Sequence, residues 1–142
     1  MSEFWYEGIA IGDTVTGCLV EDLSRLHIAQ YAGASGDFNS VHVDERFAVE
    51  DAGRPSVIGH GMFTMGLTAT FLTSLVGRGP LLSFGGRFLA PVLPGDTLSC
   101  TVTVEDVILG DRGRNVVIRL ETSNSEGTAV FDGTAIVEAP AH

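Results

Sequence analysis

One stretch of the chain, from Gly61 to Val76, constrains the fold most, because apolar side chains occupy nearly every side of the helix it predicts. Only glycine, alanine, threonine and serine fill the gaps, so no charged face is left for solvent. The stretch is also too short to span a bilayer, which takes about 20 apolar residues. We therefore expect a helix that begins near residues 59–61, runs to Val76 and is buried in the core. Its apolar residues are Met62, Phe63, Met65, Leu67, Phe71, Leu72, Leu75 and Val76.

After this helix the sequence predicts one strand after another. Apolar residues alternate with serine and threonine in residues 98–104, which is typical of a half-buried strand. Further strands are expected at residues 81–89, 116–121 and 128–138, and a short one at 14–20, with turns at 94–96, 110–111 and 126–127. The glycine pair at 85–86 indicates a bulge or a close contact. One buried helix and a mostly antiparallel sheet pack most economically when the sheet curls around the helix, the hotdog architecture. An open sandwich with helices on one face is the alternative.

Two shorter helices are predicted before the long one. Ser24 is placed to cap a helix over residues 25–32 that stops at Gly33. Asp44 is placed to cap a second helix that runs to Asp51 and ends at the following glycine and proline. No repeat or linker divides the 142 residues, so we predict a single α+β domain over residues 1–142.

The charge of the chain excludes several functions. Eighteen acidic and 8 basic residues give a net charge of −10, which argues against nucleic-acid binding and against docking on an anionic membrane. A small anionic ligand is still compatible, because a few arginines can hold one phosphate. Arg54, Arg78 and Arg87 flank the long helix or the next strand and are the candidates, although each is also explained as an ordinary surface charge.

The remaining composition predicts a cytoplasmic protein without a metal. Cys18 and Cys100 are far apart and form no metal-binding spacing, so we expect both to be small buried side chains. No basic segment followed by an apolar run stands at the N-terminus, so no signal peptide is expected.

The polar segment from Tyr31 to His42 is the first candidate site. Asp37 and His42 are five residues apart across an expected loop, and a carboxylate beside an imidazole forms a general acid–base pair. Gly33 and Gly36 supply the backbone freedom that such convergence needs. By spacing alone, a capping aspartate and a core histidine explain the segment as well.

The second candidate site is the start of the long helix, where His60 and Gly61 stand. Main-chain N–H groups are unpaired there and the helix dipole is positive, so such a site can stabilise the oxyanion of a thioester. A plain glycine-containing turn is the alternative. His60 is either a structural histidine that holds the loop or a residue of the site, and the structural interpretation is favoured.

Taken together, these segments resemble the MaoC-like family, which includes (R)-specific enoyl-CoA hydratases and related acyl dehydratases. The resemblance covers roughly residues 6–135. It is carried by three segments in a fixed order: Ser35-Gly36-Asp37-Phe38-Asn39-Ser40-Val41-His42 with Ala48, then His60-Gly61-Met62, then Arg87-Phe88, Pro91-Val92 and Pro94-Gly95-Asp96-Thr97.

The resemblance implies a hotdog homodimer that adds water reversibly, on one face, to a trans-2-enoyl thioester to give an (R)-3-hydroxyacyl thioester. It places the catalytic roles on Asp37 and His42 and leaves open which of them delivers the proton. Asn39 then holds the loop or the water, Ser35 and His60 support the site, and the N–H of Gly61 is the oxyanion donor. No cofactor is implied, since the CoA thioester is itself the substrate.

The sequence departs from the family pattern at two positions. Ser40 replaces the motif proline, so we expect altered loop geometry or substrate preference with the chemistry retained. Ala90 stands where many relatives carry a basic residue, which removes one expected phosphate contact.

Three other functions compete with an enzyme for CoA thioesters. The same chemistry on an acyl carrier protein is disfavoured by the net charge of −10, because carrier proteins are acidic. A non-catalytic acyl-binding subunit of a heteromer has no need of both Asp37 and His42. A hotdog thioesterase fits the segment from Asp37 to His42 less well than water addition to a double bond does.

Overall fold

A computed structural model describes residues 8–77, 81–110 and 113–139. Its sheet has five strands in the order β1-β3-β4-β5-β2, and every neighbouring pair is antiparallel. The strands are β1 (Thr14–Val20), β2 (Leu81–Phe88), β3 (Leu98–Gly110), β4 (Gly113–Asn124) and β5 (Ala129–Ala139). The helices are α1 (Arg25–Ser35), α2 (Ser40–Val43), the π-helical turn η2 (Phe47–Asp51) and α3 (Gly61–Val76).

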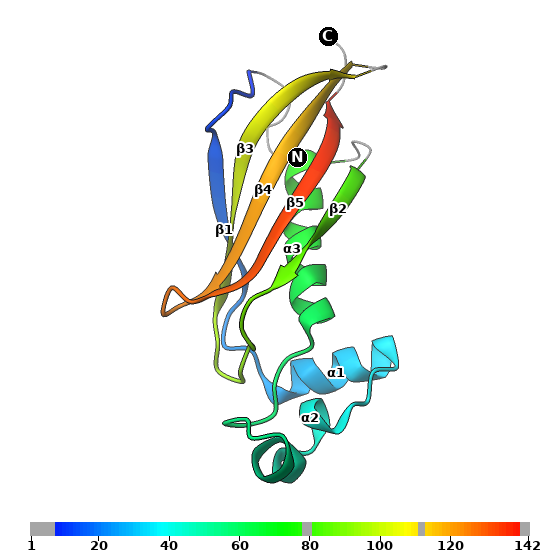
Figure 1. The fold of residues 1–142 in the computed structure, drawn as a ribbon, viewed down its shortest axis with the longest axis vertical. Coiled ribbons are helices and arrows are strands. Elements are labelled where there is room, and N and C mark those ends of the chain that lie inside the picture. Colours follow the sequence, from blue (N-terminus) through cyan, green and yellow to red (C-terminus); the bar gives the residue numbers. More distant parts are fainter. Residues whose placement is uncertain (1–7, 78–80, 111–112, 140–142) are drawn as a thin grey trace.

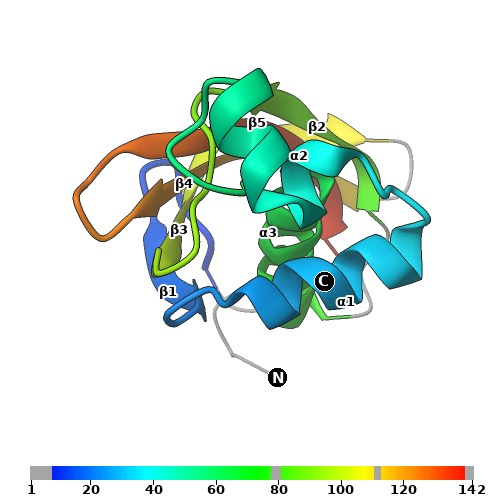
Figure 2. The same cartoon turned by 90° about the horizontal axis from the view of Figure 1, so that it is seen from below.

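The sheet curves over α3, and α1 and α2 lie together at one end of that helix (Figures 1 and 2). This arrangement confirms the predicted hotdog fold and excludes the open sandwich. Every fourth residue of α3 is buried against the sheet, as a helix with one covered face requires. These residues are Thr64, Thr68, Leu72 and Val76.

The expectation that α3 is buried all round is wrong in this single chain. The sheet covers one side of the helix only, and Met62 on another side is 56% exposed. Phe63, Met65 and Leu67 are half-buried. The apolar surface of α3 is therefore larger than the surface that one copy of the sheet covers.

Alternation along the strands builds the main core. In β3, Cys100, Val102 and Val104 are buried against α3, while the threonines between them are half-buried. Both β3 and β4 extend beyond their predicted ends and pair from Leu98 with Asn124 to Gly110 with Gly113. The glycine pair of β2 marks a close contact: a Cβ at Gly86 would lie 2.5 Å from the carbonyl oxygen of Asp132. The irregularity of β2 lies nearer its start, between Leu81 and Ser83.

Both predicted N-caps are confirmed. Ser24 and His27 form a capping box at the start of α1, and the carboxylate of Asp44 accepts a hydrogen bond from the N–H of Phe47 at 3.2 Å. The predicted end of α1 is wrong: the helix passes Gly33 and ends at Gly36, which adopts the left-handed conformation (φ +76°) that stops a helix.

The two cysteines differ from each other. Cys100 is buried, and this burial raises the pKa of its thiol to about 11. Cys18 is exposed on the edge strand β1, so the prediction of a buried side chain is wrong for this residue. None of the helices in the described ranges is long and apolar enough to cross a membrane.

Candidate active site

Asp37 lies in the turn between α1 and α2, where Gly36 reverses the chain. The hydroxyl of Ser35 donates to the carbonyl oxygen of Tyr31 and accepts from the N–H of Asp37, at 2.8 Å and 3.2 Å. Oδ1 of Asp37 accepts from the N–H of Asn39 at 3.2 Å. One carboxylate oxygen is thereby held by the loop, and the other, Oδ2, accepts no hydrogen bond from the described residues. The side chain of Asp37 is 54% exposed.

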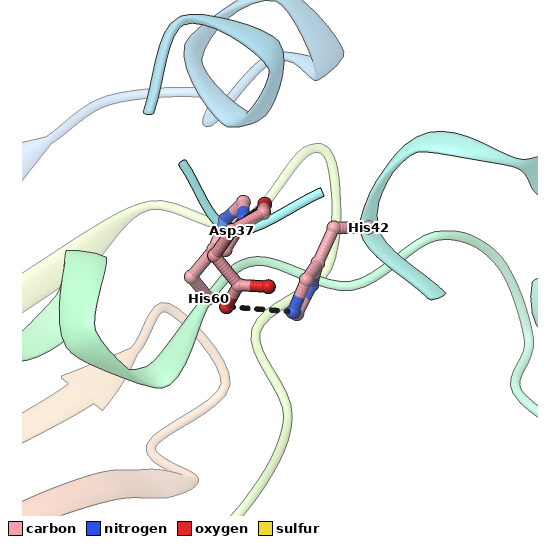
Figure 3. A group of neighbouring side chains, drawn as sticks. All are labelled: Asp37, His42 and His60. Atoms are coloured by element: carbon pink, nitrogen blue, oxygen red, sulfur yellow. Dashed lines mark hydrogen bonds and ion pairs between the residues drawn. The ribbon is translucent and has the colours of Figure 1, made fainter. Parts of the chain in front are cut away.

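His42 lies on α2, which the sequence had indicated as loop. The side chain of Asn39 caps this helix by accepting from the N–H of Val41 at 3.1 Å. Nδ1 of His42 lies 2.7 Å from the carbonyl oxygen of Ile58. A carbonyl only accepts, so Nδ1 carries a hydrogen and Nε2 of the neutral ring presents its lone pair. That Nε2 lies 3.9 Å from Oδ2 of Asp37. Figure 3 shows the two groups pointing toward each other.

Ser40, which replaces the motif proline, is the first residue of α2. This is the helix position that proline fits best, and Asn39 already has the extended ψ (131°) that a following proline would impose. The loop therefore has, with serine at position 40, the backbone geometry that the motif proline would favour.

His60 joins the two parts of the site. It is 2% exposed, and its Nε2 lies 3.0 Å from the main-chain carbonyl oxygen of Asp37. Its ring stacks on the ring of His42, with centroids 3.8 Å apart and planes at 24°. His60 therefore holds the loop of Asp37, as its structural interpretation expects, and it also contacts the ring of His42.

Gly61 is the first residue of α3, and within the described ranges its N–H has no main-chain acceptor. It lines a pocket of about 350 Å³ together with His42, Arg54, Thr64 and Phe88. The helix dipole and the unpaired N–H make this end of the pocket electropositive. The ring of His42 and the N-terminal end of α3 thus line one pocket, and the carboxylate of Asp37 lies 3.9 Å from that ring.

The MaoC like domain model matches residues 10–126 of the chain. The chain belongs to this family. It is 32% identical, over 96% of its length and 92% of the relative's, to the (R)-specific enoyl-CoA hydratase of Rhodospirillum rubrum. It is 33% identical, over 96% of its length and 84% of the relative's, to the 3-hydroxybutyryl-CoA dehydratase of Methylorubrum extorquens.

Two further comparisons agree with this family. The MaoC-like chain is 38% identical to the 3-hydroxyacyl-thioester dehydratase Y of Mycobacterium tuberculosis over 72% of its length, and it spans about a third (35%) of that relative. The R-hydratase PhaJ1 from Pseudomonas aeruginosa has the same fold, with a TM-score of 0.83 and 26% identity over 98% of this chain and 87% of that one.

The three arginines proposed as phosphate ligands differ in whether they line the pocket of this MaoC-like domain. Arg54 lines the pocket, and its predicted contact with a substrate phosphate stays a prediction. Arg87 does not line it, because side chains alternate along β2 and it is the neighbouring Phe88 that faces the pocket. Arg78 lies outside the described residues. Ala90, the second departure from the family pattern, is a pocket residue.

An ion pair in a second pocket that His42 also lines was not predicted. Arg25 grips both carboxylate oxygens of Glu45, at 2.6 Å and 3.2 Å. This hydrogen bond, with a second from the N–H of Val57, holds the pKa of Glu45 below its ordinary value. The two residues are 20 positions apart in the sequence, and no spacing rule links them. The contact of His42 with the Ile58 carbonyl was not predictable either, because every residue has a main-chain carbonyl.

Asp37, His42 and His60 place one potential metal-ligand atom each within 4.8 Å of one another. The chemistry of these donors favours acid–base work over chelation. Nδ1 of His42 and Nε2 of His60 both donate to carbonyl oxygens, and the two rings are stacked face to face, so their remaining lone pairs do not converge.

Proposed function

We propose that this MaoC-like domain is an (R)-specific enoyl-CoA hydratase, a hydro-lyase that adds water reversibly to trans-2-enoyl-CoA. The observation that carries the proposal is the pairing of Asp37 and His42 across 3.9 Å, with His42 and Gly61, whose N–H is unpaired, lining one pocket. Both full-length relatives are named for activity on CoA thioesters, one as a hydratase and one as a dehydratase, which are the two directions of one reaction.

The gap between the catalytic groups suits a water molecule. A separation of 3.9 Å is too long for a hydrogen bond, but one water can donate to both Oδ2 of Asp37 and Nε2 of His42 at ordinary distances of about 2.8 Å. Both atoms are acceptors when the carboxylate is ionised and the ring is neutral. The lone pairs of the water oxygen then point away from Asp37 and His42, toward the pocket that His42 lines.

The reaction involves two proton transfers, one from the water to the Asp37–His42 pair and one from the pair to Cα of the substrate. The water oxygen forms a bond to Cβ as the Cα–Cβ π bond breaks, and the electron pair moves to the thioester oxygen. The N–H of Gly61 stabilises the charge on this oxygen. The pair of Asp37 and His42 removes a proton from the water and delivers a proton to Cα on the same face, so the pair ends unchanged and no cofactor takes part.

Charge favours CoA over a carrier protein. Arg25 is paired with Glu45, and Arg46 with Glu50 at 2.8 Å, so the charges of these two arginines are already paired. With a net charge of −10, the chain repels an acidic carrier domain, whereas a small thioester needs few cations. Arg54 at the pocket is the residue proposed to contact its phosphates.

The working form is proposed to be a homodimer. Strand β2 lies at the edge of the sheet, and Leu82 on it is 51% exposed. Met62 and Phe88, at the start of α3 and the end of β2, are 56% and 49% exposed. An apolar sheet edge of this kind pairs with a second strand, and a second copy of the chain supplies one.

The test is hydration of trans-2-enoyl-CoAs of several chain lengths. The expected result is loss of the ultraviolet absorbance of the enoyl thioester and formation of the (R)-3-hydroxyacyl-CoA, identified by chiral analysis. Absence of hydration at every chain length, with a folded protein, rejects the proposed function. Formation of the (S) product rejects the stereochemical part.

A further inference from the structure

His60 is a buried polar residue with one satisfied nitrogen and one that is not. Nε2 donates to the main chain of Asp37, while no described residue offers a partner to the buried Nδ1. We infer that His60 is a positioning residue of the hydratase reaction, which fixes the distance between Asp37 and His42 through its Nε2–H and its ring. This inference rests on the proposed function.

The hydrogen bond at Nε2 ties two distant segments together. Asp37 follows α1, whereas His60 is the N-cap residue of α3, 23 positions further along the chain. The carbonyl oxygen of Asp37 belongs to the residue whose carboxylate reacts, so the bond anchors the backbone of that residue to the helix that starts with Gly61. Because the carboxylate is 54% exposed, few other contacts hold it in place.

The ring of His60 also restrains His42. One face packs on the His42 ring at 3.8 Å, and Tyr31 packs against His60 with centroids 4.8 Å apart. Tyr31 in turn stacks on Phe63 of α3 at 5.0 Å. The stack prevents His42 from tilting toward His60, while the Ile58 carbonyl fixes the rotation of the His42 ring. Its Nε2 is thereby kept toward Asp37.

The unpaired Nδ1 separates this role from an ordinary core contact. A buried nitrogen without a partner destabilises the fold by about 1–3 kcal/mol, a penalty that an apolar ring of similar shape avoids. Stacking alone therefore favours phenylalanine at this position. Histidine is preferable only where its other nitrogen is needed, and that nitrogen contacts Asp37.

Three variants test the inference. His60→Phe keeps a stacking ring and loses the donor. His60→Gln loses the ring but places an amide N–H near the position of Nε2, and His60→Asn is its matched control, one methylene too short to reach the Asp37 carbonyl. For each variant, kcat and KM are measured with crotonyl-CoA. Thermal unfolding gives its melting temperature, and circular dichroism shows whether it is folded.

We expect kcat to fall by about 100-fold in His60→Phe and His60→Asn, the loss that follows when a catalytic group is displaced by about 1 Å. The kcat of His60→Gln should stay within about tenfold of the wild type. KM stays unchanged, since His60 is buried and does not reach substrate. His60→Phe loses the hydrogen bond to Asp37 but also the unpaired buried nitrogen, so its melting temperature should stay close to that of the wild type.

Two results overturn the inference while the wild type is active: a folded His60→Phe variant with kcat within about twofold of the wild type, or a folded His60→Gln variant no faster than His60→Asn. If His60→Phe does not fold, the comparison of glutamine with asparagine decides alone. A wild type that hydrates no enoyl-CoA instead rejects the proposed function, so the two failures are distinguishable.

Discussion

Oδ2 of Asp37 and Nε2 of His42 face each other across 3.9 Å, a distance that leaves room for one shared water and none for a direct hydrogen bond. Each group is fixed by its other polar atom. Oδ1 of Asp37 accepts from the loop, and Nδ1 of His42 donates to the Ile58 carbonyl. The free atoms of an acid and a base are thus directed at one point by the main chain.

Removing either group of this pair should stop turnover without unfolding the chain. We expect Asp37→Asn and His42→Ala each to lower kcat with crotonyl-CoA by at least about 100-fold, since general acid–base catalysis contributes this much. Asp51→Asn, at an exposed position of η2, is the matched control and should keep wild-type activity. Near-normal turnover in either site variant would show that the roles are assigned wrongly.

The start of α3 should not tolerate a side chain. A Cβ at Gly61 would lie 3.1 Å from the ring of Phe88 and beside the N–H proposed to bind the thioester oxygen. We expect Gly61→Ala to lower kcat by about 10²-fold, the usual effect of disturbing one oxyanion donor.

Gly66 on the same helix provides the control for this substitution. Nothing lies within 4 Å of a Cβ at Gly66. Gly66→Ala should keep activity and raise the free energy of unfolding by about 0.8–1 kcal/mol, because alanine favours the helix. Equal activity of the two alanine variants, measured with crotonyl-CoA, would remove Gly61 from the mechanism.

The sequence predicted most of the fold because its strong patterns are local. Alternation in residues 98–104, the apolar run of α3 and the caps Ser24 and Asp44 each depend on nearby residues, and all recur in the structure. The end of α1 was misplaced because two glycines, Gly33 and Gly36, both qualified as stops, and only the tertiary path of the loop selects the second.

The acid–base pair of the candidate site was predictable from the sequence, whereas the contacts that hold the neighbouring segments in place were not. The spacing of Asp37 and His42, helped by the family resemblance, identified both partners of the pair. The Ile58 carbonyl that sets the His42 tautomer and the Arg25–Glu45 pair join segments 16 and 20 positions apart. No spacing rule links residues so far apart in the sequence, so only the folded chain reveals these contacts.

The two thiols should react at very different rates. Cys18 is exposed, whereas Cys100 is buried with its pKa raised to about 11. At pH 8, iodoacetamide should modify Cys18 readily and Cys100 only after unfolding, because the thiolate is the reactive form. Mass spectrometry of digests checks this, and rapid labelling of Cys100 in the folded protein would contradict its burial.

The same pKa predicts how stability depends on alkaline pH. The unfolded thiol of Cys100 loses its proton near its ordinary value of 9.0, while the folded thiol keeps it until about 11. The unfolded state therefore binds fewer protons in this window, and the free energy of unfolding should fall as pH rises from 9 to 11. Cys100→Ala should flatten this part of the profile in urea titrations. An unchanged slope would assign the loss to other groups.

The exposed edge of β2 should carry the dimer contact. Light scattering at micromolar concentration should give twice the 15.0 kDa of one chain. Leu82→Glu should lower this mass by placing a charge on the apolar edge, whereas Leu109→Glu, at a leucine that is 91% exposed on β3, should not. A monomeric wild type would contradict the proposed homodimer.

A hydroxyl pair between α3 and the sheet should be strongly coupled. Thr68 donates to the carbonyl oxygen of Thr64, so Thr122 is the donor in the 2.7 Å bond between the two hydroxyls. Both residues are fully buried. Thr68→Val should therefore lower the free energy of unfolding by about 1–3 kcal/mol, because it removes the acceptor of a buried donor and leaves Thr122 with the weak thiol of Cys100.

Adding Thr122→Val to Thr68→Val should recover most of that loss, since valine has the shape of threonine and no donor then remains unpaired. Urea denaturation of the wild type, both single variants and the double variant measures the coupling free energy. A double variant less stable than Thr68→Val would show that each hydroxyl has independent partners. Recovery would show that the two groups act as one polar contact, which fixes the register of α3 on β4 within an otherwise apolar core.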